Sequence, residues 1–168
     1  MTVTKLSSRQ AKKKTSLRER VSEAEWKVRT DLAAAYQLAV VYGWTDMILT
    51  HFSARVPDAE NQFLLNAYGL MFDEVTASNL VKIDHQGNIV EEITGFGVNQ
   101  AGFVIHGCVH EARPEAQCVL HTHTRAGIAV AGLASFIGIP RSSSLSATFS
   151  PSLAFFGRET SSRKSVSS

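Results

Sequence analysis

The sequence predicts an α/β domain, and three observations indicate it. A long segment with apolar residues at helical spacing comes first, over residues 23–42. Short segments rich in β-forming residues, separated by turn residues, follow between 48 and 91. A second helix, a strand and a small-residue helix come last, between 103 and 133. With 168 residues, the chain is long enough to bury one core.

The first helix has recognisable signals at both ends. Ser22, with Glu25 three residues later, resembles a capping box, and Gly43 is a typical stop. The apolar residues that follow helical spacing are Trp26, Leu32, Ala33, Tyr36, Leu38, Ala39 and Val40.

The next stretch predicts strands joined by turns. Residues 48–56 have β character, Pro57 and Asp58 form a turn, and residues 63–66 return as the second strand of an antiparallel hairpin. Thr76 and Ser78 can cap a short segment at 77–80. The two further predicted strands are 81–84 and 89–91, with a turn at 85–88 between them.

A second helix is predicted over 103–113, where Pro114 ends it. Its expected apolar side consists of Val104, Ile105, Cys108 and Val109. His106 and His110 are four residues apart and therefore share one face. That spacing can bind a metal, but the glutamate of the helical metalloprotease motif is absent. We therefore expect a packing or substrate-pocket role for these two histidines.

Residues 117–124, which read Gln-Cys-Val-Leu-His-Thr-His-Thr, predict a buried strand that ends in two histidines. Because side chains on a strand alternate between faces, His121 and His123 point the same way and form half of a metal site. A catalytic zinc normally has three protein ligands, so the pair alone is also compatible with no metal. A small-residue helix at 125–133 follows.

Composition excludes several classes of function. The net charge of +2 is too small to indicate a nucleic-acid partner. No apolar run approaches a membrane span, and no apolar segment follows the basic N-terminus as in a secretory signal. Gly95-Phe96-Gly97 lacks the third glycine and the βαβ context of a dinucleotide site. Cys108 and Cys118 are expected to be buried free thiols in a reducing compartment, and we expect a cytoplasmic protein.

The two ends differ in composition from the middle, and three regions are expected. Residues 1–21 form a basic, disordered arm. Residues 22–134 form the folded domain. Residues 135–168, in which 12 of 34 residues are serine, form a tail without a sustained apolar period. If the tail packs, Phe149, Phe155 and Phe156 are its expected anchors.

Residues 26–133 resemble the class II aldolase/adducin family, closest to its adducin-like members. The segments that carry the resemblance read THFSARVP, FLLNAYGLMFDEVTASNLVKID, GNIVEE, AGFVIHGCVHEARPEAQCVLHTHT and RAGIAVAGL. The resemblance implies a three-layer α/β/α sandwich with a mostly antiparallel central sheet, commonly assembled as tetramers. It also implies a divalent metal, zinc first, that acts as a Lewis acid on a small hydroxy-carbonyl substrate. His121 and His123 match the family's first two metal ligands.

Three departures from the family pattern stand out. Gly102 occupies the position of the acid/base glutamate and cannot transfer a proton. Only parts of the aldolases' phosphate-binding set remain, so we expect His51, Asn66, Tyr68 and Gly69 to contact a different small substrate. The resemblance stops near Leu133, before the family's third metal histidine, so the domain is expected to be truncated and its metal affinity low.

Three functions are compatible with this sequence. The first is a metal-dependent lyase or epimerase, with His121 and His123 on the metal and His106 or His110 assisting proton transfer. The second is a non-catalytic, self-associating interaction module of the adducin kind, which contacts the actin–spectrin membrane skeleton. The third is an inactive, truncated remnant of either.

Overall fold

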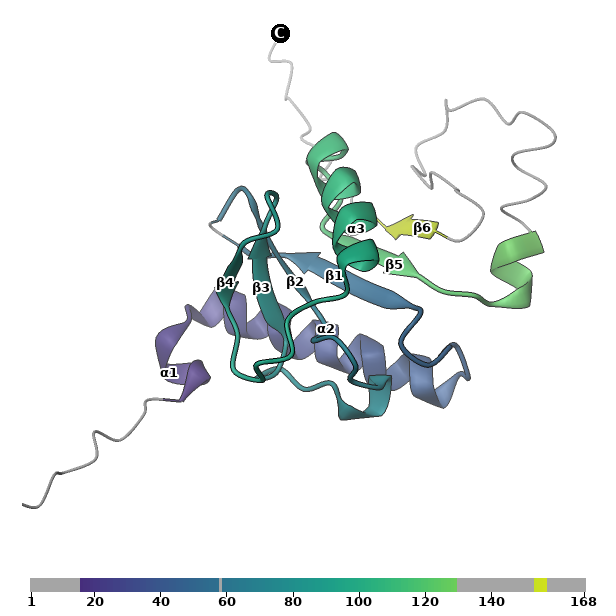
Figure 1. The fold of residues 1–168 in the computed structure, drawn as a ribbon, viewed down its shortest axis with the longest axis horizontal. Helices are drawn as coiled ribbons and strands as arrows, with labels where there is room; N and C mark the ends of the chain where they lie inside the picture. Colours follow the sequence, from purple (N-terminus) through teal and green to yellow (C-terminus); the bar gives the residue numbers. More distant parts are fainter. Residues whose placement is uncertain (1–15, 58, 130–152, 157–168) are drawn as a thin grey trace, which may run out of the picture.

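A computed structural model of the chain describes residues 16–57 and 59–129, and the backbone of 153–156. Two helices come first, followed by four strands interrupted by one 3-10 turn, then a third helix and two more strands (Figure 1). Residues 125–129 are also helical. The elements are α1 (Leu17–Arg20), α2 (Glu23–Val41), β1 (His51–Arg55), β2 (Gln62–Leu65), η1 (Phe72–Glu74), β3 (Val81–Asp84), β4 (Ile89–Glu91), α3 (Gln100–Ala112), β5 (Cys118–His121) and β6 (Leu153–Phe156).

The strands form one antiparallel sheet in the order β4-β3-β2-β1-β5-β6. β1 to β4 follow one another as hairpins. The chain then passes through α3 and returns as β5 on the other side of β1. This return brings two segments about 65 residues apart in sequence into direct register, and it is the step that builds the candidate site described below.

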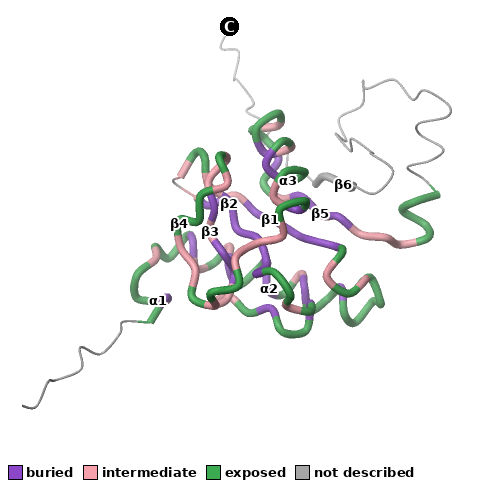
Figure 2. The backbone as a smooth tube through the Cα atoms, in the orientation of Figure 1, coloured by how far each residue is buried: buried purple, intermediate pink, exposed green. Residues whose placement is uncertain are grey.

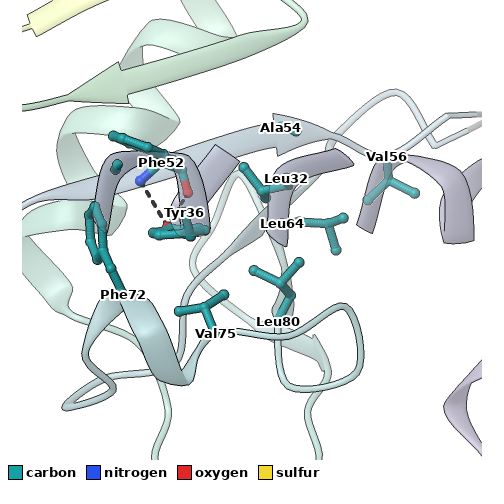
Figure 3. Packing of buried hydrophobic residues seen from close by; sticks show 10 residues of the cluster. Leu32, Tyr36, Phe52, Ala54, Val56, Leu64, Phe72, Val75 and Leu80 are labelled. Carbon is teal, nitrogen blue, oxygen red and sulfur yellow. Dashed lines mark hydrogen bonds between the residues drawn. The ribbon is translucent and has the colours of Figure 1, made fainter. Parts of the chain in front are cut away.

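The face of the sheet that α2 covers has an apolar core. Leu32, Tyr36 and Ala39 of α2 pack against Phe52, Ala54 and Leu64 of the sheet, with Phe72 and Leu80 closing the cluster (Figure 3). The Tyr36 hydroxyl accepts a 2.8 Å hydrogen bond from the Phe52 amide, which fixes the helix relative to β1. The rings of Tyr36 and Phe52 stack with centroids 5.0 Å apart.

The opposite face is covered by α3, so the domain has three layers. On β2, Leu64 faces α2, whereas Phe63 and Leu65 face the other way and pack with Val81, Ile83 and Phe103 of α3. Figure 2 shows the buried stretches of β1 and β2 at the middle of the sheet. The predicted α/β/α sandwich with a mostly antiparallel sheet is confirmed.

The boundaries of several elements differ from the predictions. The segment at 77–80 is a turn, and the helical turn of this region is η1, at 72–74. α3 begins three residues earlier than predicted, because Asn99 caps it through the amides of Ala101 and Gly102. β5 ends at His121, so His123 lies in the segment that follows the strand.

The predicted apolar side of α3 is wrong. Val104 and Ile105 are 49% and 40% exposed, and Cys108 is an exposed thiol rather than a buried one. The buried residues of this helix are Gly102, His106, Gly107 and His110. Glycines without side chains allow the helix to approach the sheet closely, so the buried face holds small and polar residues instead of large apolar ones.

The two ends of the chain are only partly described. α1 lies within the stretch that we expected to be an arm, and its Leu17 is buried. Residues 1–15 lie outside the described residues. In the Ser-rich tail the structure describes only β6, whose backbone pairs with β5 from Cys118↔Phe156 to His121↔Leu153. Among the described helices, none is long and apolar enough to cross a membrane.

Candidate metal centre

The sheet register places three histidines together under the N-terminal half of α3. His51 begins β1 and His121 ends β5, and the two residues are directly opposite each other in the antiparallel pair. Opposite residues of a pair point to the same face, with Cβ atoms about 5 Å apart. His123 follows two residues later, and its ring centroid lies 4.8 Å from that of His121. Figure 1 shows β1 and β5 side by side below α3.

His121 and His123 direct their Nε2 atoms at each other, 3.1 Å apart. The Nδ1 atom of His123 lies 2.7 Å from Oδ2 of Asp46. An ionised carboxylate can only accept, so Nδ1 of His123 donates to Asp46 and its Nε2 is the nitrogen left to face an ion. Two Nε2 atoms at this separation are compatible with neighbouring ligands of one ion at bond lengths of about 2.0–2.1 Å.

His51 is buried next to this pair. Its ring centroid is 6.1 Å from that of His121, and the two rings are nearly parallel. A Cβ built on Gly102 would lie 3.1 Å from three atoms of the His51 ring, which is closer than a side chain can comfortably sit. The glycine at position 102 therefore leaves room for the His51 ring. The ring nitrogens of His51 form no well-aligned hydrogen bond within the described residues, and the Ile48 backbone is their polar neighbour.

His106 and His110 of α3 point toward the sheet, and both contact Ser53 of β1. Ser53 Oγ lies 2.6 Å from Nδ1 of His106 and 2.9 Å from Nε2 of His110. His106 is completely buried and its ring centroid is 6.1 Å from that of His51. His110 is 1% exposed and packs against Phe63. His106 thus borders the candidate centre, whereas His110 lies one helical turn farther away.

Burial keeps these imidazoles neutral. It lowers the pKa of His51 to about 4, with a further contribution from the neighbouring His121 and His123. Burial is also the largest cause of the lowered pKa of His121, and it brings the pKa of His110 to about 3. The pKa of His106 is lowered well below its ordinary value by burial and then by His51. Neutral imidazole is the form that binds metal ions.

The other predicted substrate residues, Asn66, Tyr68 and Gly69, do not lie next to the histidine pair. Asn66 is buried, and its Oδ1 is 2.9 Å from the Tyr36 hydroxyl, so it is tied to the α2 side of the sheet. Tyr68 is half exposed, and its amide donates to the Gly97 carbonyl. Gly69 has a φ of +82°, a conformation that favours glycine. Of the four predicted substrate residues, only His51 adjoins the histidine pair.

The residues present fit part of a metal site. The Nε2 atom of His123, whose ring Asp46 orients, and the facing Nε2 atom of His121 are the observations that fit. Among residues 16–57 and 59–129, no group of three or more His, Cys, Asp or Glu side chains is arranged to hold a metal ion. The pair therefore needs at least one more donor.

Two members of this layer were missed at the sequence level. Asp46 lies in the loop before β1, and Ser53 is an ordinary strand residue. Neither forms a pattern with a histidine close in sequence, since Asp46 and His123 are 77 positions apart. The pairing of β1 with β5 brings Asp46 to His123, and the packing of α3 on β1 brings Ser53 to His106 and His110. Neither arrangement can be deduced from a single sequence.

A separate cleft of about 590 Å³ lies at the other end of the same layer. It is lined by Arg55, His85, His110 and Glu111, among others. Arg55 donates to the carbonyls of Ala116 and Arg113 near the end of α3. The cleft does not include His51, His121 or His123.

The sequence and fold are similar to those of class II aldolases. The profile of the Class II Aldolase and Adducin N-terminal domain matches residues 30–162. An aldolase II superfamily protein from Pseudomonas syringae has 62% identity and a TM-score of 0.67, with 70% of this chain and 47% of that chain covered. L-fuculose 1-phosphate aldolase from Glaciozyma antarctica has 31% identity and a TM-score of 0.60, with 66% and 45% covered.

A similar stretch occurs in a second kind of protein. Mouse alpha-adducin is 48% identical over 107 residues, which are 63% of this chain and 15% of that protein. The chain spans less than half the length of the first curated relatives that it matches, 44% and 42%.

Proposed function

The chain belongs to the class II aldolase and adducin family, and on this premise we propose that it binds a divalent metal ion, zinc first, and acts as a lyase-type domain on a small hydroxy-carbonyl compound. One observation carries the proposal: His121 and His123 face each other through Nε2, and Asp46 fixes the tautomer of His123. A carboxylate behind a histidine is the usual outer partner of a metal ligand.

The chain's own residues supply binding and orientation. His121 and His123 would hold the ion, and Asp46 would orient His123. Burial keeps the neighbouring imidazoles neutral, as a metal ligand requires. When bound, a divalent ion supplies Lewis-acid polarisation of a carbonyl oxygen.

Proton transfer needs a group other than Gly102. Of the two histidines assigned to this role, His106 is the nearer to the centre, because its ring borders His51. His110 would act only through Ser53, which both histidines contact. His51, Tyr68, Gly69 and Asn66 remain the proposed substrate contacts.

We also propose a homo-oligomer that functions in the cytoplasm. The outward side of α3 exposes Val104 and Ile105, and Ile128 in the helical residues that follow β5 is 46% exposed. Exposed apolar residues of this kind favour association with another copy.

The test is elemental analysis of the purified chain beside a His121→Ala/His123→Ala double variant. His85→Ala is the matched control, because His85 lies on the same side of the sheet, at the distant cleft. We expect near-stoichiometric zinc, manganese or iron in the wild type and in the control, and none in the double variant. Cleavage of hydroxy-carbonyl compounds should disappear with chelation and return with metal. A wild-type chain that takes up no metal would contradict the proposal.

The second candidate is a non-catalytic interaction module of the adducin kind. The observation in its favour is 48% identity to mouse alpha-adducin over a stretch that includes Gly102 in place of an acid/base residue. It predicts co-sedimentation with actin filaments, or with filaments and spectrin together, that the His121→Ala/His123→Ala variant retains. Metal-dependent lyase activity without filament binding would exclude it.

A further inference from the structure

We propose that His51 is the third imidazole ligand of the metal centre, supplied by β1 from within the described domain. The inference rests on the proposed metal function and adds to it the donor that the histidine pair lacks. It also gives a reason for the glycine at position 102.

The backbone places His51 where a third ligand is needed. His51 and His121 are opposite residues of the β1–β5 pair, so their side chains leave the same face of the sheet. Their ring centroids are 6.1 Å apart, against 4.8 Å for His121 and His123. His51 is therefore only slightly farther from His121 than the partner that already makes contact.

Burial leaves the ring nitrogens of His51 without a strong partner. The residue is 4% exposed, and within the described part of the chain its ring nitrogens form no well-aligned hydrogen bond, with the Ile48 backbone as a polar neighbour. Leaving buried polar atoms without a partner costs stability. His106 and His110, by contrast, are both engaged by Ser53. His51 can turn about its side-chain bonds toward the ion and gives up only its contact with the Ile48 backbone.

The backbone at Gly102 lies close against the His51 ring. Any side chain at position 102 would meet the His51 ring, because even a Cβ would lie 3.1 Å from three of its atoms. The glycine at position 102 therefore makes room for the buried imidazole of the neighbouring strand. A neutral imidazole nitrogen is a donor that suits zinc.

The test counts the imidazoles on the metal directly. The chain is labelled with ¹⁵N in its histidines and loaded with ¹¹³Cd, and nitrogen–cadmium couplings are recorded. We expect three coupled imidazoles, with one signal lost in His51→Gln. Coupling from His121 and His123 alone would overturn the third-ligand inference and leave the proposed metal function intact, whereas an absence of coupling from all histidines would overturn both.

Affinity provides an independent readout with a matched control. His51→Gln should raise the zinc dissociation constant at least about tenfold, since loss of even an outer partner has this effect. His85→Ala should leave the constant unchanged. Gly102→Ala keeps every imidazole but crowds the His51 ring, so it should weaken zinc binding in the same direction. Equal affinities in wild type and His51→Gln would overturn the inference, and the coupling count of the unmodified chain decides the matter if His51→Gln does not fold.

Discussion

The two faces of the sheet are built from different chemistry. The α2 face holds leucine, phenylalanine, tyrosine and valine in one continuous cluster. The α3 face has an apolar cluster around Phe63 over β2 and β3. Over β1 and β5 it instead holds His51, Ser53 and His121 from the sheet and His106 and His110 from the helix. Apolar side chains need no hydrogen-bond partner. On the α3 face, by contrast, five histidines each have a buried ring nitrogen that lacks a hydrogen bond within the described chain.

Within β1, alternate residues serve the two faces of the sheet. On β1, Phe52 and Ala54 face α2, and His51 and Ser53 face the histidine layer. Buried polar groups without partners lower stability, so their persistence on one face indicates a use for them. The α2 face is thus expected to carry most of the folding energy, and the α3 face most of the binding.

The largest change in stability is expected from Phe52→Ala, which removes a side chain from the apolar cluster on the α2 face. Phe52 is 1% exposed and contacts Tyr36 and Phe72. Truncation of a buried phenylalanine costs about 3–5 kcal/mol. The free energy of unfolding in urea measures this loss, and Val104→Ala, on the exposed side of α3, should change it by less than about 0.5 kcal/mol. Equal losses in the two variants would contradict the assignment of the core.

A smaller effect is expected from Asp46→Asn, which leaves the core untouched. The amide can offer its nitrogen to His123 and so no longer fixes the tautomer with Nε2 free. We expect zinc affinity to fall about 10- to 100-fold, as is usual for loss of an outer carboxylate. Isothermal titration with zinc measures it, with Asp31→Asn, an exposed aspartate of α2, as the control. An unchanged affinity would show that Asp46 does not orient a ligand.

The smallest expected effect is on how stability depends on pH, and it comes from a buried histidine of the α3 face, His110. The folded pKa of His110 is lowered to about 3, while the unfolded chain has an ordinary value of about 6.5. As pH falls below 6.5 the unfolded chain takes up the proton first, so stability is complete above 6.5 and declines toward 3. His110→Gln should therefore lose less stability than the wild type between pH 7.5 and 5.5, by about 1 kcal/mol.

Urea unfolding midpoints at the two pH values provide the measurement for His110. The other buried imidazoles of the layer act in the same direction, so the wild type and the variant both lose stability on acidification. A variant that loses as much as the wild type would show that His110 does not contribute to the acid sensitivity.

The sequence predicted what depends on local pattern. The long helix, the hairpins, and the pair His121 and His123 follow from spacing along the chain, and the family resemblance supplied the three-layer arrangement. The buried side of α3 was mispredicted because Gly102 and Gly107 let buried histidines take the place of apolar residues. Spacing also gave no reason to group His51 or Asp46 with His121 and His123, because only the β1–β5 register joins them.

The most direct test of the metal centre is a crystal structure of the chain grown with zinc, with anomalous data collected at the zinc edge. We predict one strong peak within about 2.1 Å of Nε2 of both His121 and His123. A peak only at the distant cleft, beside His85 and His110, or no peak at all would contradict the assignment of the metal centre to the β1–β5 edge of the α3 face.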